Sequence, residues 1–378
     1  MVVHFPRYLE DALSKRQQSS ALRELRILEG AIDLCSNDYL GVARLLGARI
    51  ESFSAQQIGA TGSRLVSGTT AAHEELESYL SAFHDSETAL VFGSGYEANL
   101  GLLSILGGRH DTIIYDELSH ASMRDGISMS AARSYSFRHN DLHDLRAKIK
   151  AARGEVFIVV ESLYSMDGDF APLDEICALC EEVGAFLVVD EAHATGIYGP
   201  QGAGLVQDTG LQSRVFARVH TFGKALGYKG ACVVGPARLR EALINFSRPF
   251  IYSTAPDLLS LRLMRLAYDT ARAADEARQS LRERISDFRE LRARVPELSC
   301  LPSESAIQAI IIPGNELVVA AEHLLSEAGY AVRAIRSPTV PSGSERLRIC
   351  LHAYNTRRDL EGLFATLGDV VPRRAHGQ

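Results

Sequence analysis

The stretch Phe186-Leu-Val-Val-Asp-Glu-Ala-His193 joins four consecutive apolar residues to an acidic residue and, three positions further on, to a histidine. A short apolar run rich in β-branched residues is typical of a strand that is buried on both faces. A carboxylate at the end of such a strand is costly to bury unless a cationic group accompanies it. The stretch therefore predicts a buried strand that ends at a polar site containing Asp190.

Similar short apolar runs continue on both sides of this strand and alternate with stretches of helical period. The seven runs lie at residues 89–92, 112–115, 134–137, 156–160, 186–189, 216–221 and 231–234. Helix-length segments separate many of them, among them residues 96–106, 142–152 and 173–183. Strand and helix alternating in this way predict an α/β fold with a mainly parallel seven-stranded sheet flanked by helices.

The two ends of the chain predict further parts. Residues 1–50 contain a helical pattern at 8–16 followed by an irregular arm. Residues 261–378 begin with a long charged helical pattern and continue with clustered strands and helices, which indicates a smaller C-terminal α+β domain. Residues 51–260 then form the large α/β domain.

Composition narrows the classes of partner. The chain of 378 residues carries 40 Lys and Arg against 47 Asp and Glu, a net charge of -7, so no global field attracts nucleic acid or an anionic membrane. No run approaches the ~18 apolar residues of a membrane span. The six cysteines are scattered rather than arranged as a disulfide framework. We expect a cytoplasmic protein that binds neither nucleic acid nor membrane.

The residues that follow the apolar runs should carry the chemistry, because ligands of such sheets bind beyond the carboxyl ends of the strands. Gly93-Ser-Gly-Tyr96 opens a helix there, and its backbone N–H groups can hold a phosphate. Thr221-Phe-Gly-Lys224 places a lysine at the same rim. A phosphate cradle, the acid Asp190 and a lysine that can bond an aldehyde together fit pyridoxal phosphate.

Plainer interpretations exist for each of these residues alone. Lys224 can be a surface charge, Asp190 a turn residue, and His120 or His193 a histidine satisfied within the core. Their order along the chain and their shared rim favour a site instead. No metal site is expected, because His73-Glu-Glu-Leu-Glu77 lacks the second histidine of a zinc helix and indicates a solvated helix face.

Eight ordered stretches carry a resemblance to a known family. They lie at residues 35–41, 59–68, 93–99, 116–122, 161–169, 190–196, 221–227 and 338–348, and so extend over nearly the whole chain. On these motifs the chain resembles the α-oxoamine synthases, which are fold-type I pyridoxal-phosphate-dependent transferases.

The resemblance implies roles for particular residues. Lys224 resembles the lysine that bonds the cofactor and moves protons, Asp190 the partner of the pyridine nitrogen, His193 a donor to the ring hydroxyl, and His120 the imidazole stacked on the ring. Further cofactor contacts are implied for Ser94, Gly95, Tyr96, Glu161, Ser165 and Thr221, and, from a second subunit, for Ser253 and Thr254. The implied substrate-binding residues are Asn37 and Arg348 for the amino-acid carboxylate, with Thr339 and Arg23 on the acyl-CoA side.

Arg348 can also be interpreted without the family. A planar guanidinium binds a carboxylate through two hydrogen bonds, which lysine cannot do. The alternative is that Arg346 and Arg348 are two outward charges on an edge strand, and the sequence leaves this open.

The resemblance implies an enzyme that joins an amino acid to an acyl thioester with loss of CO2 and free thiol, acting as a homodimer with a shared active site. In chain length and in the stretches 221–227 and 250–255, the chain most resembles those family members that use L-alanine and a pimeloyl thioester, carried by CoA or a carrier protein. Members that use serine or glycine are the alternatives. Two other classes remain open, namely a catalytically silent partner subunit and an aminotransferase or lyase on the same fold.

Overall fold

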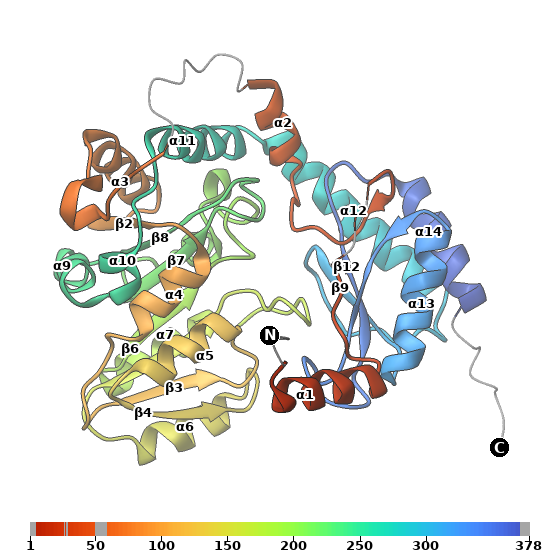
Figure 1. The fold of residues 1–378 in the computed structure, drawn as a ribbon, viewed down its shortest axis with the longest axis horizontal. Coiled ribbons are helices and arrows are strands. Elements are labelled where there is room, and N and C mark those ends of the chain that lie inside the picture. The colour runs from red at the N-terminus through yellow and green to blue at the C-terminus, as the bar shows by residue number, and fades with distance from the viewer. Residues whose placement is uncertain (1–4, 26, 28, 50–58, 371–378) are drawn as a thin grey trace. The chain divides into compact units, whose positions relative to one another are not determined.

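The computed structural model describes residues 5–25, 27, 29–49 and 59–370 (Figure 1). The chain folds into two compact units. The larger unit comprises Asn37–Ser165 and Phe170–Arg278, and the smaller comprises Met1–Ser36, Met166–Asp169 and Gln279–Gln378.

The larger unit is built on a seven-stranded sheet, as the sequence predicts. Its strands are β2 (Thr88–Phe92), β3 (Thr112–Asp116), β4 (Arg133–Phe137), β5 (Val156–Glu161), β6 (Phe186–Asp190), β7 (Ala217–Thr221) and β8 (Ala231–Gly235). They lie in the order β2-β8-β7-β6-β5-β3-β4. Strand β8 is antiparallel to both of its neighbours, whereas β7, β6, β5, β3 and β4 run parallel. The carboxyl ends of β5, β6 and β7 therefore meet at one edge.

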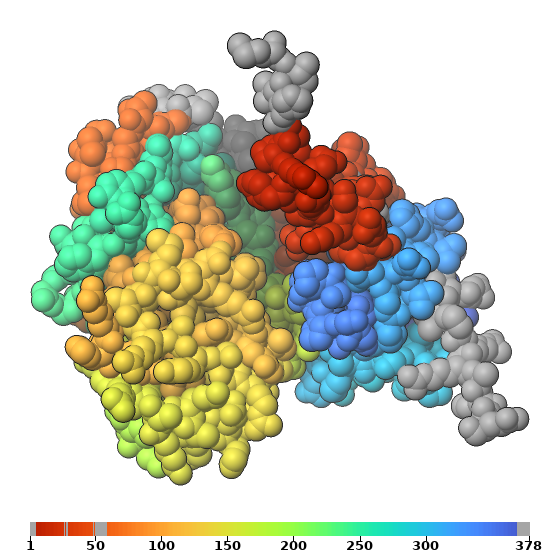
Figure 2. Space-filling view, turned by 60° about the horizontal axis from the view of Figure 1, so that its bottom comes forward, coloured from red at the N-terminus to blue at the C-terminus, as the bar shows by residue number. Residues whose placement is uncertain are grey.

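Helices of the larger unit surround this sheet (Figure 1). They are α2 (Val42–Arg49), α3 (Ala71–Phe83), α4 (Gly95–Leu103), α5 (Ala121–Met129), α6 (Leu142–Ala151), α7 (Leu173–Val183), α8 (Leu205–Asp208), α9 (Ala237–Phe246), α10 (Arg248–Tyr252) and α11 (Leu258–Arg272). Two short helices of other types, η2 (Arg64–Gly68) and η3 (Pro200–Gly202), lie in loops. The space-filling view shows the green surface of α9 to α11 beside the orange and yellow surface of α3 to α6 (Figure 2), and α10 contacts α4.

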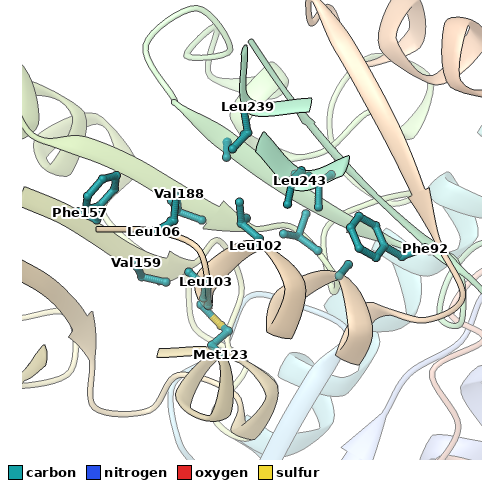
Figure 3. Packing of buried hydrophobic residues seen from close by; sticks show 14 of the residues in the cluster. Phe92, Leu102, Leu103, Leu106, Met123, Phe157, Val159, Val188, Leu239 and Leu243 are labelled. Carbon is teal, nitrogen blue, oxygen red and sulfur yellow. The ribbon is translucent and has the colours of Figure 1, made fainter. Parts of the chain in front are cut away.

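Alternate residues of the strands supply two separate cores. Val159 of β5 and Val188 of β6 pack with Leu102 of α4 and Met123 of α5 on one face (Figure 3). Ile158 and its neighbours pack against α6 and α7 on the other face. Successive side chains of a strand point to opposite faces, so continuous apolar runs are what a sheet covered on both faces requires. Each fully buried leucine contributes roughly 2–5 kcal/mol, the usual cost of truncation to alanine.

The smaller unit contains α1 (Arg7–Gln18), α13 (Asn315–Glu327), α14 (Arg357–Val370) and two small sheets. In one sheet β12 (Arg346–Cys350) lies between β11 (Arg333–Ile335) and β9 (Ile307–Ile311), with both pairings antiparallel. In the other, β1 (Ile32–Asp33) pairs in parallel with β10 (Tyr330–Ala331). Helix α12 (Asp275–Ala293) begins in the larger unit and continues in the smaller.

The compact units have different limits from the predicted domains, which place boundaries after residues 50 and 260. Helix α11 extends well beyond residue 260 yet packs on α2 and α3, where the Tyr79 hydroxyl donates to Asp269 at 3.0 Å. The end of the predicted arm belongs with the C-terminal residues, because β1 pairs with β10 and the Cys350 amide donates to the Leu34 carbonyl at 2.9 Å. Among the described helices, none combines the length and the apolar composition that crossing a membrane requires.

Candidate active site

A cavity of about 330 Å³ lies in the larger unit at the carboxyl ends of β5, β6 and β7. Most of the predicted site residues line it, although they come from segments that are far apart in the sequence. Those residues are Asn37, Ser94, Gly95, Tyr96, His120, Glu161, Asp190, His193, Thr221 and Lys224. A volume of this size is at the lower end of what small-molecule sites provide. The residues predicted to lie together at the strand ends therefore line a single cavity.

The amino end of α4 forms one wall of the cavity. Ser94 is the N-cap residue, and its side chain accepts a hydrogen bond from the Glu97 amide at 3.2 Å. Gly95 lies so close to β7 that an added Cβ would stand 2.4 Å from Thr221 Cγ2. Only glycine permits this approach, which brings the first-turn amides of the helix next to the strand end. Such a helix end favours an anion, so the wall fits the phosphate of the predicted cofactor.

Asp190 ends β6 and is only 5% exposed. Its Oδ1 accepts from the Ala192 amide at 2.8 Å, and its Oδ2 accepts from the Asn99 side-chain amide at 2.7 Å. These two N–H donors fix the orientation of the buried carboxyl group. A carboxyl group held in this way at a cavity can face the nitrogen of a pyridine ring.

Lys224 lies on the hairpin that joins β7 to β8. The Phe222 amide donates to the Gly230 carbonyl at 2.9 Å and the Tyr228 amide donates to the Phe222 carbonyl at 2.8 Å, so the loop is closed at its base. Gly227 has a φ of +65°, a conformation that glycine adopts readily. The tight loop holds the half-buried lysine at the cavity.

Glu161 and His120 form a second polar group at the strand ends. The His120 backbone amide donates to Glu161 Oε1 at 2.7 Å. Burial, together with the negative charge of Asp190, raises the pKa of Glu161 well above the usual range of a carboxyl group. Partial desolvation lowers the pKa of His120, and the Lys224 charge acts in the same direction, while Asp190 opposes it. The cavity therefore favours a neutral imidazole.

His193 is held by Tyr39, which belongs to the predicted N-terminal arm. Its Nδ1 lies 2.8 Å from the hydroxyl of Tyr39, and that hydroxyl donates to Asn37 Oδ1 at 3.1 Å. The two rings meet edge to face, with centroids 6.1 Å apart. This contact orients an imidazole that lines the cavity.

Other predicted site residues do not line this cavity within the described part of one chain. Ser165 follows β5 by four residues, and Ser253 follows α10. Thr254 is exposed and forms an isolated antiparallel bridge with Ser63. Arg23 and Thr339 line a different cavity, of about 400 Å³, in the smaller unit, where Arg23 Nη2 donates to Thr339 Oγ1 at 3.4 Å.

Arg348 belongs to the smaller unit and Asn37 to the larger. The interpretation of Arg346 and Arg348 as outward charges on an edge strand is wrong, because β12 is the central strand of its sheet and both residues are buried. Arg346 forms an ion pair with Asp167.

Four residues of the cavity region were not singled out from the sequence. Asn99, Ser122 and Lys229 line the cavity, and Tyr39 contacts His193. Asn99, Ser122 and Tyr39 lie inside the family-like stretches 93–99, 116–122 and 35–41, so those stretches were the available signal. Lys229 lies outside them, on the hairpin that carries Lys224.

Known proteins match this chain over most of its length. The family described as aminotransferase class I and II matches residues 29–367. The 8-amino-7-oxononanoate synthase of Emericella nidulans is 38% identical, over 97% of this chain and 95% of that protein. A solved serine palmitoyltransferase with its PLP internal aldimine has a TM-score of 0.87 at 28% identity, covering 96% of this chain and 97% of the other.

A third protein, the 8-amino-7-oxononanoate synthase of Francisella tularensis, has a TM-score of 0.74 at 27% identity, covering 90% of this chain and 98% of the other. Both the sequence relatives and the structural neighbours are thus of the kind that the motifs indicate, and the predicted fold-type I architecture is confirmed. The chain belongs to the aminotransferase class I and II family and, within it, to the α-oxoamine synthases.

Proposed function

We propose that this chain is a pyridoxal-phosphate-dependent acyltransferase that condenses L-alanine with a pimeloyl thioester. The products would be 8-amino-7-oxononanoate, CO2 and the free thiol of CoA or a carrier protein, as in biotin biosynthesis. The observation that carries the proposal is that Lys224, Asp190 and the α4 helix end line one cavity in a chain 38% identical to an 8-amino-7-oxononanoate synthase.

The residues of the cavity provide what the cofactor requires. Ser94, Gly95 and Tyr96 would hold its phosphate at the helix end, with Thr221 beside them. Lys224 would bond its aldehyde carbon. Asp190 would pair with its ring nitrogen and keep that nitrogen protonated, and His193 would donate to its ring hydroxyl. When bound, pyridoxal phosphate supplies a cationic ring that accepts the electron pair left by a broken bond at Cα of the amino acid.

The chain's own groups would then bind, orient and move protons. Arg348 and Asn37 would hold the amino-acid carboxylate, which decides which Cα bond is broken. Lys224 Nζ, once displaced by the substrate amine, would take the Cα proton. His120 would donate a hydrogen bond to the acyl carbonyl oxygen while the new carbon–carbon bond forms and the thiolate leaves. Loss of CO2 and return of a proton to Cα complete the balance.

A second candidate is a serine-using enzyme of the same family. It is favoured by the TM-score, which is 0.87 with serine palmitoyltransferase and 0.74 with the 8-amino-7-oxononanoate synthase of Francisella tularensis. Three relatives found by sequence, at 36–38% identity, are 8-amino-7-oxononanoate synthases, which favours alanine. Backbone similarity reports the fold, whereas side chains select the substrate, so we prefer the alanine reaction.

The remaining alternatives are less well supported. A silent partner subunit typically lacks the lysine that bonds the cofactor, and here Lys224 lines the cavity. An aminotransferase would not release thiol from an acyl thioester. A homodimer with a shared site is part of the proposal, because Ser253 and Thr254 would contact the cofactor phosphate from the second subunit.

The experiment is a grid of L-alanine, L-serine and glycine against pimeloyl, acetyl and palmitoyl thioesters of CoA, with free thiol and product mass as the readouts. We expect thiol release to be greatest with L-alanine and pimeloyl-CoA and to yield 8-amino-7-oxononanoate. Greatest release with L-serine and palmitoyl-CoA would establish the second candidate. No amino-acid-dependent thiol release with any pair, from protein that carries the cofactor, would refute both. The Lys224→Ala variant is the matched inactive control.

A further inference from the structure

A buried chain of hydrogen bonds joins two groups that line the candidate active site, Asp190 and His120. Asn99 Nδ2 donates to Asp190 Oδ2 at 2.7 Å and to Ser122 Oγ at 3.1 Å. Ser122 Oγ lies 2.8 Å from His120 Nδ1. Asn99 is 3% exposed and Ser122 is 1% exposed, so water does not compete for these bonds.

The direction of every bond in this chain follows from the groups involved. His120 is the N-cap residue of α5, and its Nδ1 accepts from the Ser122 backbone amide at 3.2 Å. A backbone N–H can only donate, so Nδ1 carries no proton. The Ser122 hydroxyl therefore donates to Nδ1 and accepts from Asn99. The side-chain amide of Asn99 thus donates one of its two hydrogens to Asp190 and the other to Ser122.

This arrangement determines the form of the His120 ring. An imidazole that accepts at Nδ1 and is neutral carries its proton at Nε2. The amino end of α5 also disfavours an imidazolium, because the helix end is partially positive. Of the charged groups around the ring, Lys224 acts in the same direction, whereas Asp190 and Asp125 favour the cation. The Glu161 carboxyl accepts from the His120 backbone rather than from its ring.

We propose that Asn99 and Ser122 are positioning residues, which fix the orientation of the Asp190 side chain and hold His120 as a neutral imidazole protonated at Nε2. The catalytic role of this arrangement rests on the proposed function, in which Asp190 faces the cofactor nitrogen and His120 faces a substrate oxygen. His120 then acts as a hydrogen-bond donor and not as a base. Asn99 couples the two, so a change there reaches both groups.

The test is nitrogen-15 NMR of the histidine rings in the holoenzyme and in the cofactor-free protein, with the His120 signals assigned through His120→Gln. We expect the pattern of an imidazole protonated at Nε2 from pH 6 to 8. Ser122→Ala should raise the pH midpoint of the His120 titration by roughly one unit, since it removes a donor to the neutral form. Ser122→Thr retains the hydroxyl and should restore the midpoint.

Ser119→Ala is the matched control. Like Ser122→Ala, it removes one serine hydroxyl close to His120, in this case from the preceding residue. The Ser119 hydroxyl is buried without a hydrogen-bond partner among the described residues. It should leave the midpoint unchanged. The isosteric Asn99→Asp should raise the His120 midpoint and also move the pH dependence of the bound cofactor's visible absorbance, because Asp190 loses a donor.

Two results would overturn the inference. One is a His120 ring protonated at Nδ1, or an imidazolium throughout this pH range. The other is a midpoint that Ser122→Ala and Ser119→Ala shift equally. Neither readout depends on turnover, so a failed thiol-release assay with the expected ring signals would refute the proposed function and leave this inference standing.

Discussion

Glu161 and Asp190 are directly opposite each other in the register of the parallel strands β5 and β6, so two carboxyl groups reach the same cavity from adjacent strand ends. Their environments differ. Asp190 accepts from two N–H donors, whereas burial raises the pKa of Glu161 to about 8. Glu161 therefore keeps its proton to a higher pH than an ordinary glutamate, while hydrogen bonds fix Asp190, so the two neighbouring acids are suited to different roles.

The first prediction concerns stability and pH in the cofactor-free protein. Between the ordinary glutamate pKa of 4.5 and the raised pKa of about 8, folded Glu161 holds a proton that the unfolded chain has lost, so its contribution to stability falls as pH rises. Glu161→Gln removes this pH-dependent loss of stability, because glutamine does not titrate. The Tm of the variant, relative to that of the unsubstituted protein, should increase from pH 5 to pH 8.

Glu191 provides the matched comparison for Glu161. It is also fully buried, with its pKa raised to about 7, and it titrates within the same range in both proteins. The fall of Tm with pH should therefore become shallower in Glu161→Gln without disappearing. A Tm difference between the two proteins that stays constant with pH would show that Glu161 is ionised in the folded state.

The second prediction separates binding of the cofactor from its activation. Asp190→Asn keeps the shape of the side chain but removes the charge opposite the ring nitrogen. The variant should retain bound pyridoxal phosphate while exchange of the L-alanine Cα proton with deuterium falls by roughly 100-fold or more, the usual cost of losing one preorganised electrostatic contact. Proton NMR of the substrate in deuterated buffer measures this exchange. Near-normal exchange would exclude Asp190 as the partner of the ring.

The third prediction assigns the substrate carboxylate to Arg348. Arg348→Lys should raise KM for the amino acid by roughly 10- to 100-fold, because a two-point, charge-assisted contact becomes a single one. Arg346→Lys is the control on the same strand, where the arginine pairs with Asp167. That substitution should lower Tm and leave KM unchanged. Equal KM changes in the two variants would argue against a specific role for Arg348.

The fourth prediction concerns the shared site. Thr254 is exposed and does not line the cavity of its own chain, yet Thr254→Ala should weaken binding of pyridoxal phosphate by roughly 5-fold, the effect of one lost hydrogen bond. Equilibrium dialysis gives the Kd. Ser247→Ala, which removes a buried hydroxyl without a hydrogen-bond partner among the described residues, should leave the Kd unchanged. A holoenzyme that sediments as a monomer would contradict the prediction.

Much of the larger unit could be predicted because most of its strands are apolar on both faces. Each of the seven predicted runs overlaps a strand, and the helix predicted at 173–183 is α7. Strand order was not predictable, since no local pattern places β8 antiparallel between β2 and β7. In the C-terminal part, β10 and β11 are separated by a single residue yet belong to different sheets, which no local pattern indicates.

The site was predictable where the sequence context leaves a residue few roles, as with Lys224 between glycines or Asp190 after an apolar strand. Buried neutral partners such as Asn99 and Ser122 give no such signal, because their roles depend on contacts made only in three dimensions. The same limit accounts for an error. His73 and Glu77 were expected on a solvated helix face, but both are buried, and Glu77 pairs with Arg64 and Arg240 at 2.8 Å each.

The fifth prediction addresses the covalent bond between the chain and its cofactor. Two lysines, Lys224 and Lys229, line the cavity, and the proposed function assigns the bond to the first alone. Lys229→Ala should therefore retain the visible absorbance of the bound cofactor, whereas Lys224→Ala should lose the covalent attachment and turnover.

The most direct measurement is reduction of the holoenzyme with borohydride, followed by mass spectrometry of its peptides. The expected result is one pyridoxyl phosphate group per chain, on the Lys224 side chain. A group attached to Lys229 or to any other lysine, or no attached group in an active preparation, would contradict the proposed function.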